Sequence, residues 1–365
     1  MKLTKSTIFQ QAMASALIAA AFALPASAQV IDLDGETVTI VHNASPGGAT
    51  GLGSQLAADA WAKTMAGNPT IVVQSVQGGA LTKGINHVMN ARPNGLTIGW
   101  LAWQGSTRIL DPEPLQIPFD EFGVIGGVGA ANFFLHVRSD VGDGITSGEE
   151  IADLESLSFG GFSPKSAASM QTAAALDMLD VDWNFVSGFA GDGPLRAAQA
   201  RGEIEAYPAT AVIWSKELRD GPIAEGETVS GWHYAPPTED NSGMIADPAF
   251  LGEVPTFAEY YEAVKGEKPT GPAWDVIQFH GRVSNRVNWI IVAPPGTPQE
   301  HLDMLRESFH EAMTSPEYLE AATKLYGAEP NVEFWESMTG IIEDVQATPE
   351  ALKDLMREYI SRMEG

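Results

Sequence analysis

The sequence predicts an α/β protein of two lobes, each a mainly parallel sheet flanked by helices. Strand and helix patterns alternate along residues 38–101, and the same alternation returns over residues 156–207. The junctions from strand to helix are rich in glycine. Open α/β sheets bind ligands beyond the carboxyl ends of their strands, so these junctions are the first candidates for a site.

The first unit opens with an apolar strand, residues 38–41, followed by the turn Ser45–Gly51 and a helix. A second strand, residues 71–74, runs into a second glycine turn, Gly78–Ala80, and a further helix. A third strand covers residues 96–101. This β-α-β-α-β order favours a parallel sheet with helices on its faces.

The second unit repeats the first in style. A strand at residues 156–160 leads into a third turn, Gly161–Ser166, and a helix. A strand at residues 184–186 leads into a fourth turn, Gly188–Pro194, and another helix. Residues 201–207 are expected to add a strand.

The rest of the chain begins with a helix start at Pro255–Glu259, and residues 266–272 read as a loop. A strand at residues 287–292 and a proline-rich turn, Ala293–Pro298, follow. The amphipathic helices of residues 299–364 are expected to pack on the first lobe, which makes that lobe discontinuous.

A glycine turn between a strand and a helix can bind a small anion. Glycine lets the backbone approach a ligand closely, and the first N–H groups of the helix point at a negative charge. Many such turns serve only as turns. Four of them, two in each half, favour an anion or carboxylate site more than any one does alone.

The N-terminus has the pattern of an export signal. Lys2 and Lys5 precede an apolar run, and Ala26-Ser27-Ala28 is a small-residue cleavage site. We therefore expect residues 1–28 to be removed, and the remainder to be exported to a bacterial periplasm. The sequence contains no cysteine, which excludes disulfides, thiolate metal sites and a lipid-anchored cysteine.

Acidic residues dominate the charge, with 47 Asp+Glu against 21 Lys+Arg and a net charge of −26. This balance excludes nucleic acid and anionic membrane surfaces as partners. An anion site in such a chain must act at contact range, through backbone amides and helix N-termini. A saline habitat is consistent with the acidity.

Motifs of catalysis are missing from the sequence. The seven histidines have no H-x-H or H-E-x-x-H spacing, and the first turn lacks the lysine of a P-loop. No G-x-S-x-G elbow is present. We therefore expect a protein that is not an enzyme and that holds no metal and no cofactor.

The order of several short motifs resembles the periplasmic solute receptors of tripartite tricarboxylate transporters. The resemblance covers nearly all of the chain after the signal. Its motifs are Pro46-Gly47-Gly48, Gly78-Gly79, Arg92-Pro93-Asn94-Gly95-Leu96-Thr97, Gly193-Pro194, Val254-Pro255-Thr256-Phe257-Ala258-Glu259, the turn at residues 293–298, and Gly327-Ala328-Glu329-Pro330.

The resemblance implies a two-lobe, Venus-flytrap binding protein with residues 29–133 plus 250–365 in lobe 1 and residues 134–249 in lobe 2. It implies a monomeric receptor that binds a small organic carboxylate between the lobes and delivers it to the membrane permease subunits of such a transporter. Two alternatives stay open: a ligand-sensing subunit for a signalling kinase, and a periplasmic enzyme acting on a carboxylate.

Carried over residue by residue, the resemblance and the turn chemistry place fourteen residues at the ligand. These are Ser45, Gly48, Ala49, Thr50, Gly79, Ala80, Trp103, Phe162, Lys165, Ser166, Phe189, Ala190, Gly191 and Asp192. Main-chain amides and small hydroxyls of the turns would hold the carboxylate.

This sequence departs from the family pattern at several of these positions. Gly51 stands where an acid is usual, and Ala167 replaces the second of two serines. No lysine follows Phe189 in the fourth turn. Lys165 is a candidate counter-charge, and a solvated turn lysine is the competing interpretation. Phe162, Phe189 and Trp103 would favour an aromatic or aliphatic carboxylate over citrate.

Overall fold

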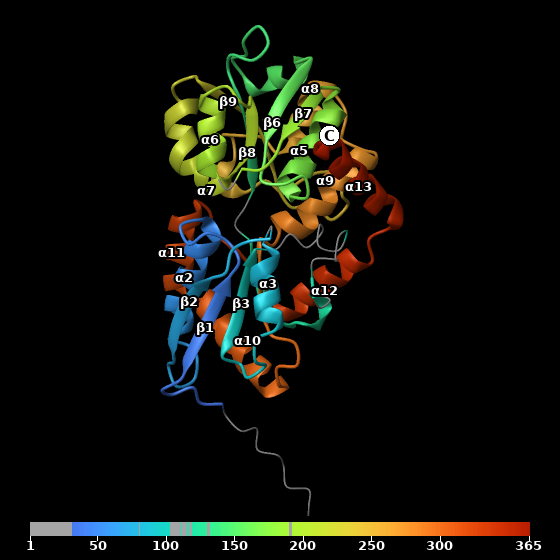
Figure 1. Cartoon of the computed structure of the whole chain (residues 1–365). Coiled ribbons are helices and arrows are strands. Elements are labelled where there is room, and N and C mark those ends of the chain that lie inside the picture. The colour runs from blue at the N-terminus through green and yellow to red at the C-terminus, as the bar shows by residue number, and fades with distance from the viewer. Residues whose placement is uncertain are drawn as a thin grey trace, which may run out of the picture. The chain divides into compact units, whose positions relative to one another are not determined.

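Two β-sheets organise the protein, shown in Figure 1 as a computed structural model. The structure describes residues 31–79, 81–102, 110, 115–116, 119–129, 132–189 and 192–365. Residues 33–365 form one compact unit. The expected export signal lies outside the described residues.

The first sheet has six strands in the order β11-β4-β10-β3-β1-β2. Its strands are β1 (Thr37–His42), β2 (Thr70–Ser75), β3 (Thr97–Ala102), β4 (Gly123–Gly129), β10 (Trp289–Ala293) and β11 (Asn331–Phe334). The second sheet has five strands in the order β7-β6-β8-β5-β9. Its strands are β5 (Phe133–Arg138), β6 (Ser156–Gly160), β7 (Asp182–Val186), β8 (Ala206–Thr210) and β9 (Thr228–Tyr234).

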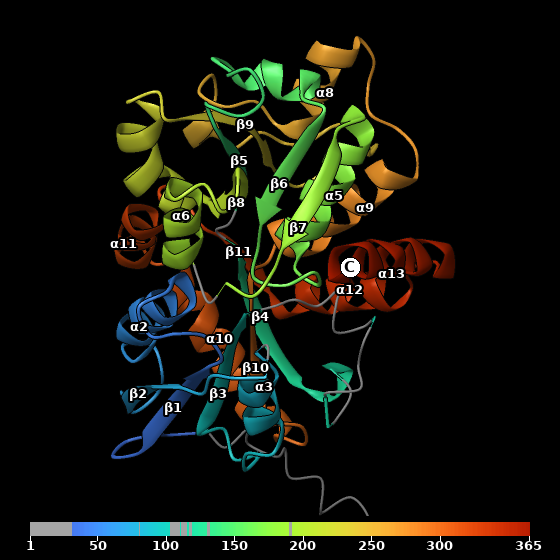
Figure 2. The same ribbon diagram turned by 45° about the horizontal axis from the view of Figure 1, so that its top comes forward.

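Helices flank both sheets (Figures 1 and 2). The α-helices are α2 (Ala49–Trp61), α3 (Thr82–Met89), α5 (Ala167–Leu179), α6 (Asp192–Ala200), α7 (Ala211–Ile213), α8 (Phe257–Lys265), α9 (Pro272–His280), α10 (Gln299–Met313), α11 (Pro316–Tyr326), α12 (Trp335–Gln346) and α13 (Glu350–Glu364). Short 3-10 helices are η1 (Phe119–Glu121), η2 (Gly148–Asp153) and η4 (Pro248–Phe250), and π-helical segments are η3 (Trp214–Ile223) and η5 (Gly281–Asn285).

The predicted α/β class is confirmed, but both sheets are mixed rather than mainly parallel. In the first sheet β1 pairs in parallel with β2 and β3, whereas β10 and β11 pair antiparallel with their neighbours. In the second, β6 pairs in parallel with β7 and β8, and β5 runs antiparallel to β8 and β9. Local β-α-β units supply the parallel pairs, while the antiparallel strands β10 and β11 come from distant parts of the chain.

A continuous apolar core joins elements of both sheets. One cluster of buried side chains contains Val41 and Leu101 from the first sheet and Leu135 and Phe159 from the second. A second cluster lies around Trp214, β8 and α6. The core is large enough to hold the turns between strands and helices in fixed positions.

The last part of the chain contacts both sheets. Helices α10 and α12 pack on β4 of the first sheet, whereas α13 packs on α5, α9 and β7. The Arg362 guanidinium forms a two-pronged ion pair with Asp177 of α5, and the Tyr359 hydroxyl donates to the same carboxylate. The expected lobe boundaries stay a prediction, and contacts of α8, α9, α11 and α13 cross them.

The segment expected as a loop at residues 266–272 gives way to a helix at its last residue, because Pro272 begins α9, a helix that the sequence did not lead us to expect. Helix α8 begins at the expected place, because Thr256 and Glu259 form a capping box there. Along the described stretches, no helix combines the length and the apolar composition that crossing a bilayer requires.

Candidate functional site

The four glycine turns lie in two adjacent pairs. Strands β1 and β2 run in parallel with His42 opposite Ser75, so the first and second turns leave the sheet side by side. Strands β6 and β7 run in parallel with Gly160 opposite Val186, so the third and fourth turns do the same. Each pair of turns therefore leaves its sheet at the carboxyl ends of two neighbouring parallel strands, which is where open α/β sheets bind ligands.

Asn43 ties the first turn to its neighbours. Its amide nitrogen lies 3.4 Å from the Leu81 carbonyl oxygen in the second turn and 3.5 Å from the Ala102 carbonyl oxygen at the end of β3. Its carbonyl oxygen accepts from the Ala102 N–H at 2.8 Å. Asn43 is fully buried, so one side chain fixes three loop ends. Sequence analysis missed Asn43, whose position directly after a buried strand was its only signal.

Thr50 lies at the start of α2, and its side chain is hydrogen-bonded to a residue of the first sheet. Its hydroxyl oxygen accepts the indole N–H of Trp289 at 2.8 Å, and both side chains are buried. The hydroxyl keeps its own hydrogen for another acceptor. Trp289 in turn stacks on Tyr326, with ring centroids 5.4 Å apart. Strand β10, which is distant in the sequence, thus orients the side chain of Thr50, one of the residues predicted to contact the ligand.

Two glycines near the start of α2, Gly51 and Gly53, have no room for a side chain. A Cβ on Gly51 would lie 2.3 Å from the Pro46 carbonyl oxygen, and one on Gly53 would lie 2.2 Å from the Tyr326 hydroxyl. Gly51 is the position where the resemblance leads one to expect an acid. The returning Pro46 backbone occupies the space that such a side chain would need.

The second turn depends on left-handed backbone. Gly78 and Gly79 have φ of 118° and 58°, and Leu81, which precedes α3, has φ of 76°. Glycine adopts this region without a steric cost, whereas leucine does not. The Asn43 contact at the Leu81 carbonyl helps to hold that conformation.

The third turn is held by serine hydroxyls. Ser166 is the N-cap of α5, where its oxygen accepts from the Ser169 N–H at 3.3 Å. The two hydroxyl oxygens lie 2.7 Å apart. Ser169, in the first turn of α5, is therefore the serine that contacts Ser166 in this chain. Lys165 is half-buried, and its backbone N–H donates to the Ser163 hydroxyl.

Asp192 carries the strongest electrostatic signal among the predicted residues. It begins α6, and one of its carboxylate oxygens is buried with no hydrogen-bond partner among the described residues. Burial raises the pKa of Asp192 to about 6, against smaller opposing effects of its own backbone N–H and of Arg196. Both the neutral and the ionised form of this carboxyl group are therefore populated slightly below neutral pH. The neutral form can donate a hydrogen bond to an anion.

The remaining predicted residues fall into three sets. Ser45 is exposed, while Gly48, Ala49 and Gly79 lie on the turn backbones. Phe162 is 39% exposed, whereas Phe189 packs against the cluster around Trp214. Ala80, Trp103, Ala190 and Gly191 lie outside the described residues.

Metal binding finds no support within the described part of the chain. No three His, Cys, Asp or Glu side chains come together there in a way that could hold an ion. Buried His136 and His280 have pKa values lowered to about 4 and about 3, and burial is the main cause for both. These histidines belong to the core and stay neutral at physiological pH.

The two mixed sheets with paired strand-to-helix turns define the fold of the two-lobe periplasmic binding proteins. No protein-family model and no curated protein matches the chain by sequence. Many solved structures share the fold, and three of them serve as examples. They are the periplasmic binding protein BugD (TM-score 0.64, 18% identity, 88% of this chain and 97% of that chain), a TctC solute binding protein from Polaromonas (0.59, 18%, 88% and 98%), and Rpa4515 of R. palustris with adipate (0.65, 18%, 88% and 97%).

These likenesses show that the chain shares the fold of the binding proteins that its sequence motifs resemble. The BugD and TctC structures are binding proteins, and the matched region spans nearly the whole of each. At 18% identity these likenesses show the fold alone. The residues that hold a ligand in this chain therefore have to be argued from its own turns.

Proposed function

We propose that this protein is an exported receptor that binds a small organic carboxylate and delivers it to a membrane permease of the tripartite tricarboxylate type. The observation that carries the proposal is the pairing of the turns after β1 and β2 and after β6 and β7. The adipate-bound relative of the same fold supports a dicarboxylate as the ligand class.

One turn pair would bind one carboxylate of the ligand, and the other pair would bind the second. Backbone N–H groups at the starts of α2 and α3 would contact the first group, together with the hydroxyl hydrogen of Thr50. The start of α5 and the neutral form of Asp192 would contact the second. Ligand would favour the state in which both pairs are engaged, so release to the permease requires them to separate.

A receptor role without turnover is part of the proposal. The motifs of catalysis are missing from the sequence, and two solved structures of the same fold, BugD and the TctC protein from Polaromonas, are described as binding proteins. The location in the periplasm rests on the export pattern of residues 1–28 and on the likeness to BugD.

Isothermal titration calorimetry with adipate at pH 6 and pH 8 tests this proposal. We expect saturable binding by the wild type and weaker binding by Thr50→Val, which keeps the side-chain shape but removes the hydroxyl. Thr70→Val is the control, because Thr70 is exposed at the opposite end of β2. A panel of mono-, di- and tricarboxylates that all fail to bind would contradict the proposal.

A further inference from the structure

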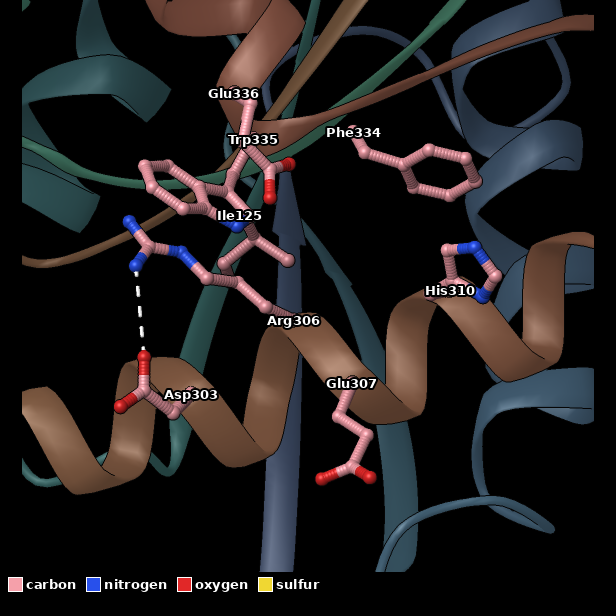
Figure 3. Close-up of a pocket in the computed structure, with 8 residues that line it drawn as sticks. All are labelled: Ile125, Asp303, Arg306, Glu307, His310, Phe334, Trp335 and Glu336. Carbon is pink, nitrogen blue, oxygen red and sulfur yellow. Dashed lines mark ion pairs between the residues drawn. The ribbon is translucent and has the colours of Figure 1, made fainter.

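Asp192 differs from other carboxylates of this chain in having no counter-charge bound to it. The half-buried Asp177 holds a two-pronged ion pair with Arg362. Even at the surface, beside the pocket of about 320 Å³ that Figure 3 shows, Asp303 lies 3.7 Å from the Arg306 guanidinium. Asp192 forms no ion pair with any described residue, and one of its oxygens is enclosed without a hydrogen-bond partner among them. An enclosed carboxylate left in this way calls for an explanation.

The groups that face Asp192 compensate little for its burial. Tyr207 of β8, the strand on which α6 packs, is fully buried, and its hydroxyl has no hydrogen-bond partner within the described part of the chain. Burial, and after it the charge of Asp192, raises the pKa of Tyr207. The Tyr207 ring lies edge-on to His136 of β5, with ring centres 4.1 Å apart, and burial keeps this histidine neutral. Arg196, one turn along α6, forms its ion pair with Glu217 of η3.

A ligand carboxylate at the second pair of turns would meet this carboxyl group. Under the proposed function, on which this inference rests, one carboxylate of the ligand binds at the starts of α5 and α6. Two ionised carboxylates in contact repel each other, and a site that holds two such groups raises the pKa of one of them strongly, so that it keeps its proton. The retained proton forms an O–H···O⁻ hydrogen bond, which is one of the strong types.

We propose that this receptor binds its dicarboxylate together with one proton, which Asp192 holds and through which it donates a hydrogen bond to the ligand carboxylate. The proton comes from solvent and returns to solvent when the ligand leaves. With a pKa of about 6 before ligand binds, Asp192 is mostly ionised above neutral pH, so the proton has to be taken up on binding. The affinity for a dicarboxylate therefore falls as pH rises.

Calorimetry of adipate binding in phosphate and in Tris measures this proton directly, because the two buffers release a proton with different enthalpies. Adipate itself is a dianion at pH 8, since ordinary carboxyl groups have pKa values near 4. We expect the wild type to take up about one proton per adipate at pH 8, and its Kd to rise about tenfold from pH 7 to pH 8. Asp192→Asn, which keeps a hydrogen-bond donor but cannot titrate, should take up no proton and bind with the same Kd at both pH values.

Two further variants are the controls. Tyr207→Phe keeps the ring and removes the neighbouring hydroxyl, so the uptake should stay near one proton if Asp192 carries it. Asp182→Asn, at an exposed carboxylate that begins β7, should behave as the wild type does. Uptake that is lost in Tyr207→Phe but kept in Asp192→Asn would place the proton elsewhere and overturn the proposal.

Other results separate this inference from the proposed function. Adipate binding without proton uptake at pH 8 would overturn the inference and leave the receptor function standing. Tighter binding of 2-aminoadipate than of adipate at pH 8 would also overturn it, because an ionised Asp192 would then hold the ammonium group of the ligand. If no mono-, di- or tricarboxylate binds at either pH, the proposed function fails and this inference fails with it.

Discussion

The first pair of turns and the second pair are built by different means. In the first pair, long-range contacts fix the backbone: Asn43 bridges three loop ends, and Trp289 binds Thr50 across 239 residues of sequence. In the second pair, Ser166 and Ser169 are three residues apart, and one carboxylate oxygen of Asp192 has no partner within the described part of the chain. The first half of the proposed site is therefore held by long-range hydrogen bonds, whereas the second half contains a carboxyl group, that of Asp192, whose protonation changes with pH.

The largest effect is expected at Asn43. Asn43→Ala removes the hydrogen bonds of a fully buried side chain and leaves the partly buried Ala102 N–H without this acceptor, so we expect a loss of about 2–4 kcal/mol in the free energy of unfolding. Urea unfolding measures this loss. Asn90→Ala, at an exposed site after α3, is the control and should change stability much less. Equal losses in the two variants would show that the first pair is not fixed in this way.

Asp192 sharpens the comparison through pH. Its pKa of about 6 lies above the ordinary value of 3.8, so the folded protein binds this proton more tightly than the unfolded chain does. The carboxyl therefore costs stability progressively as pH rises from about 4 to above 6. Asp192→Asn should gain about 2–3 kcal/mol at pH 8 and little at pH 4.

Unfolding measured at both pH values in wild type and variant isolates this effect from that of the buried histidines. The pKa values of His136 and His280 are lowered, so they have the opposite sign and lower stability as pH falls. Asp182→Asn, at an exposed carboxylate that begins β7, is the control. A gain at pH 8 no greater than the control's would contradict the assignment.

The hydrogen bond from Trp289 to Thr50 tests how the first pair of turns contributes to ligand binding. Trp289→Phe removes the indole N–H that holds Thr50, with an expected cost of about 1 kcal/mol to adipate binding, or roughly fivefold in Kd. Trp100→Phe is a matched control, because Trp100 is buried beside Trp289 but its indole N–H has no partner among the described residues. Similar losses of affinity in both variants would mean that ring volume, not the hydrogen bond, matters.

The smallest effect is expected at Lys165. If its ammonium group is a counter-charge for the ligand, Lys165→Ala should weaken adipate binding by roughly twofold to fivefold, the range for a half-exposed charge. Calorimetry at low ionic strength measures it. Lys216→Ala, an exposed lysine of η3, is the control. An unchanged Kd in Lys165→Ala would identify Lys165 as a solvated turn residue.

The difference between the two pairs also marks what the sequence could predict. The strands, the glycine turns and the helix starts follow from local signals, such as the alternation in residues 38–41 and the N-cap at Ser166. The roles of Asn43 and Trp289 depend on pairing between segments far apart in the chain, which no local pattern records. The mixed sheets escaped prediction for the same reason, since β10 and β11 enter from distant segments.

Gly51 illustrates both sides of that limit. The sequence marked it as a departure from the family pattern, and only the structure gives the cause, a Pro46 carbonyl oxygen 2.3 Å from where a Cβ would stand. Ser169 is a similar case, because only the structure shows that its hydroxyl contacts that of Ser166 from the first turn of α5.

The central claim is that both pairs of turns bind one dicarboxylate, and backbone amide NMR during an adipate titration tests it most directly. The account predicts that the resonances of Ala49 and Thr50 in the first pair and of Ser166 and Asp192 in the second shift together, with one common dissociation constant. Shifts confined to one pair, or none in either, would contradict the account.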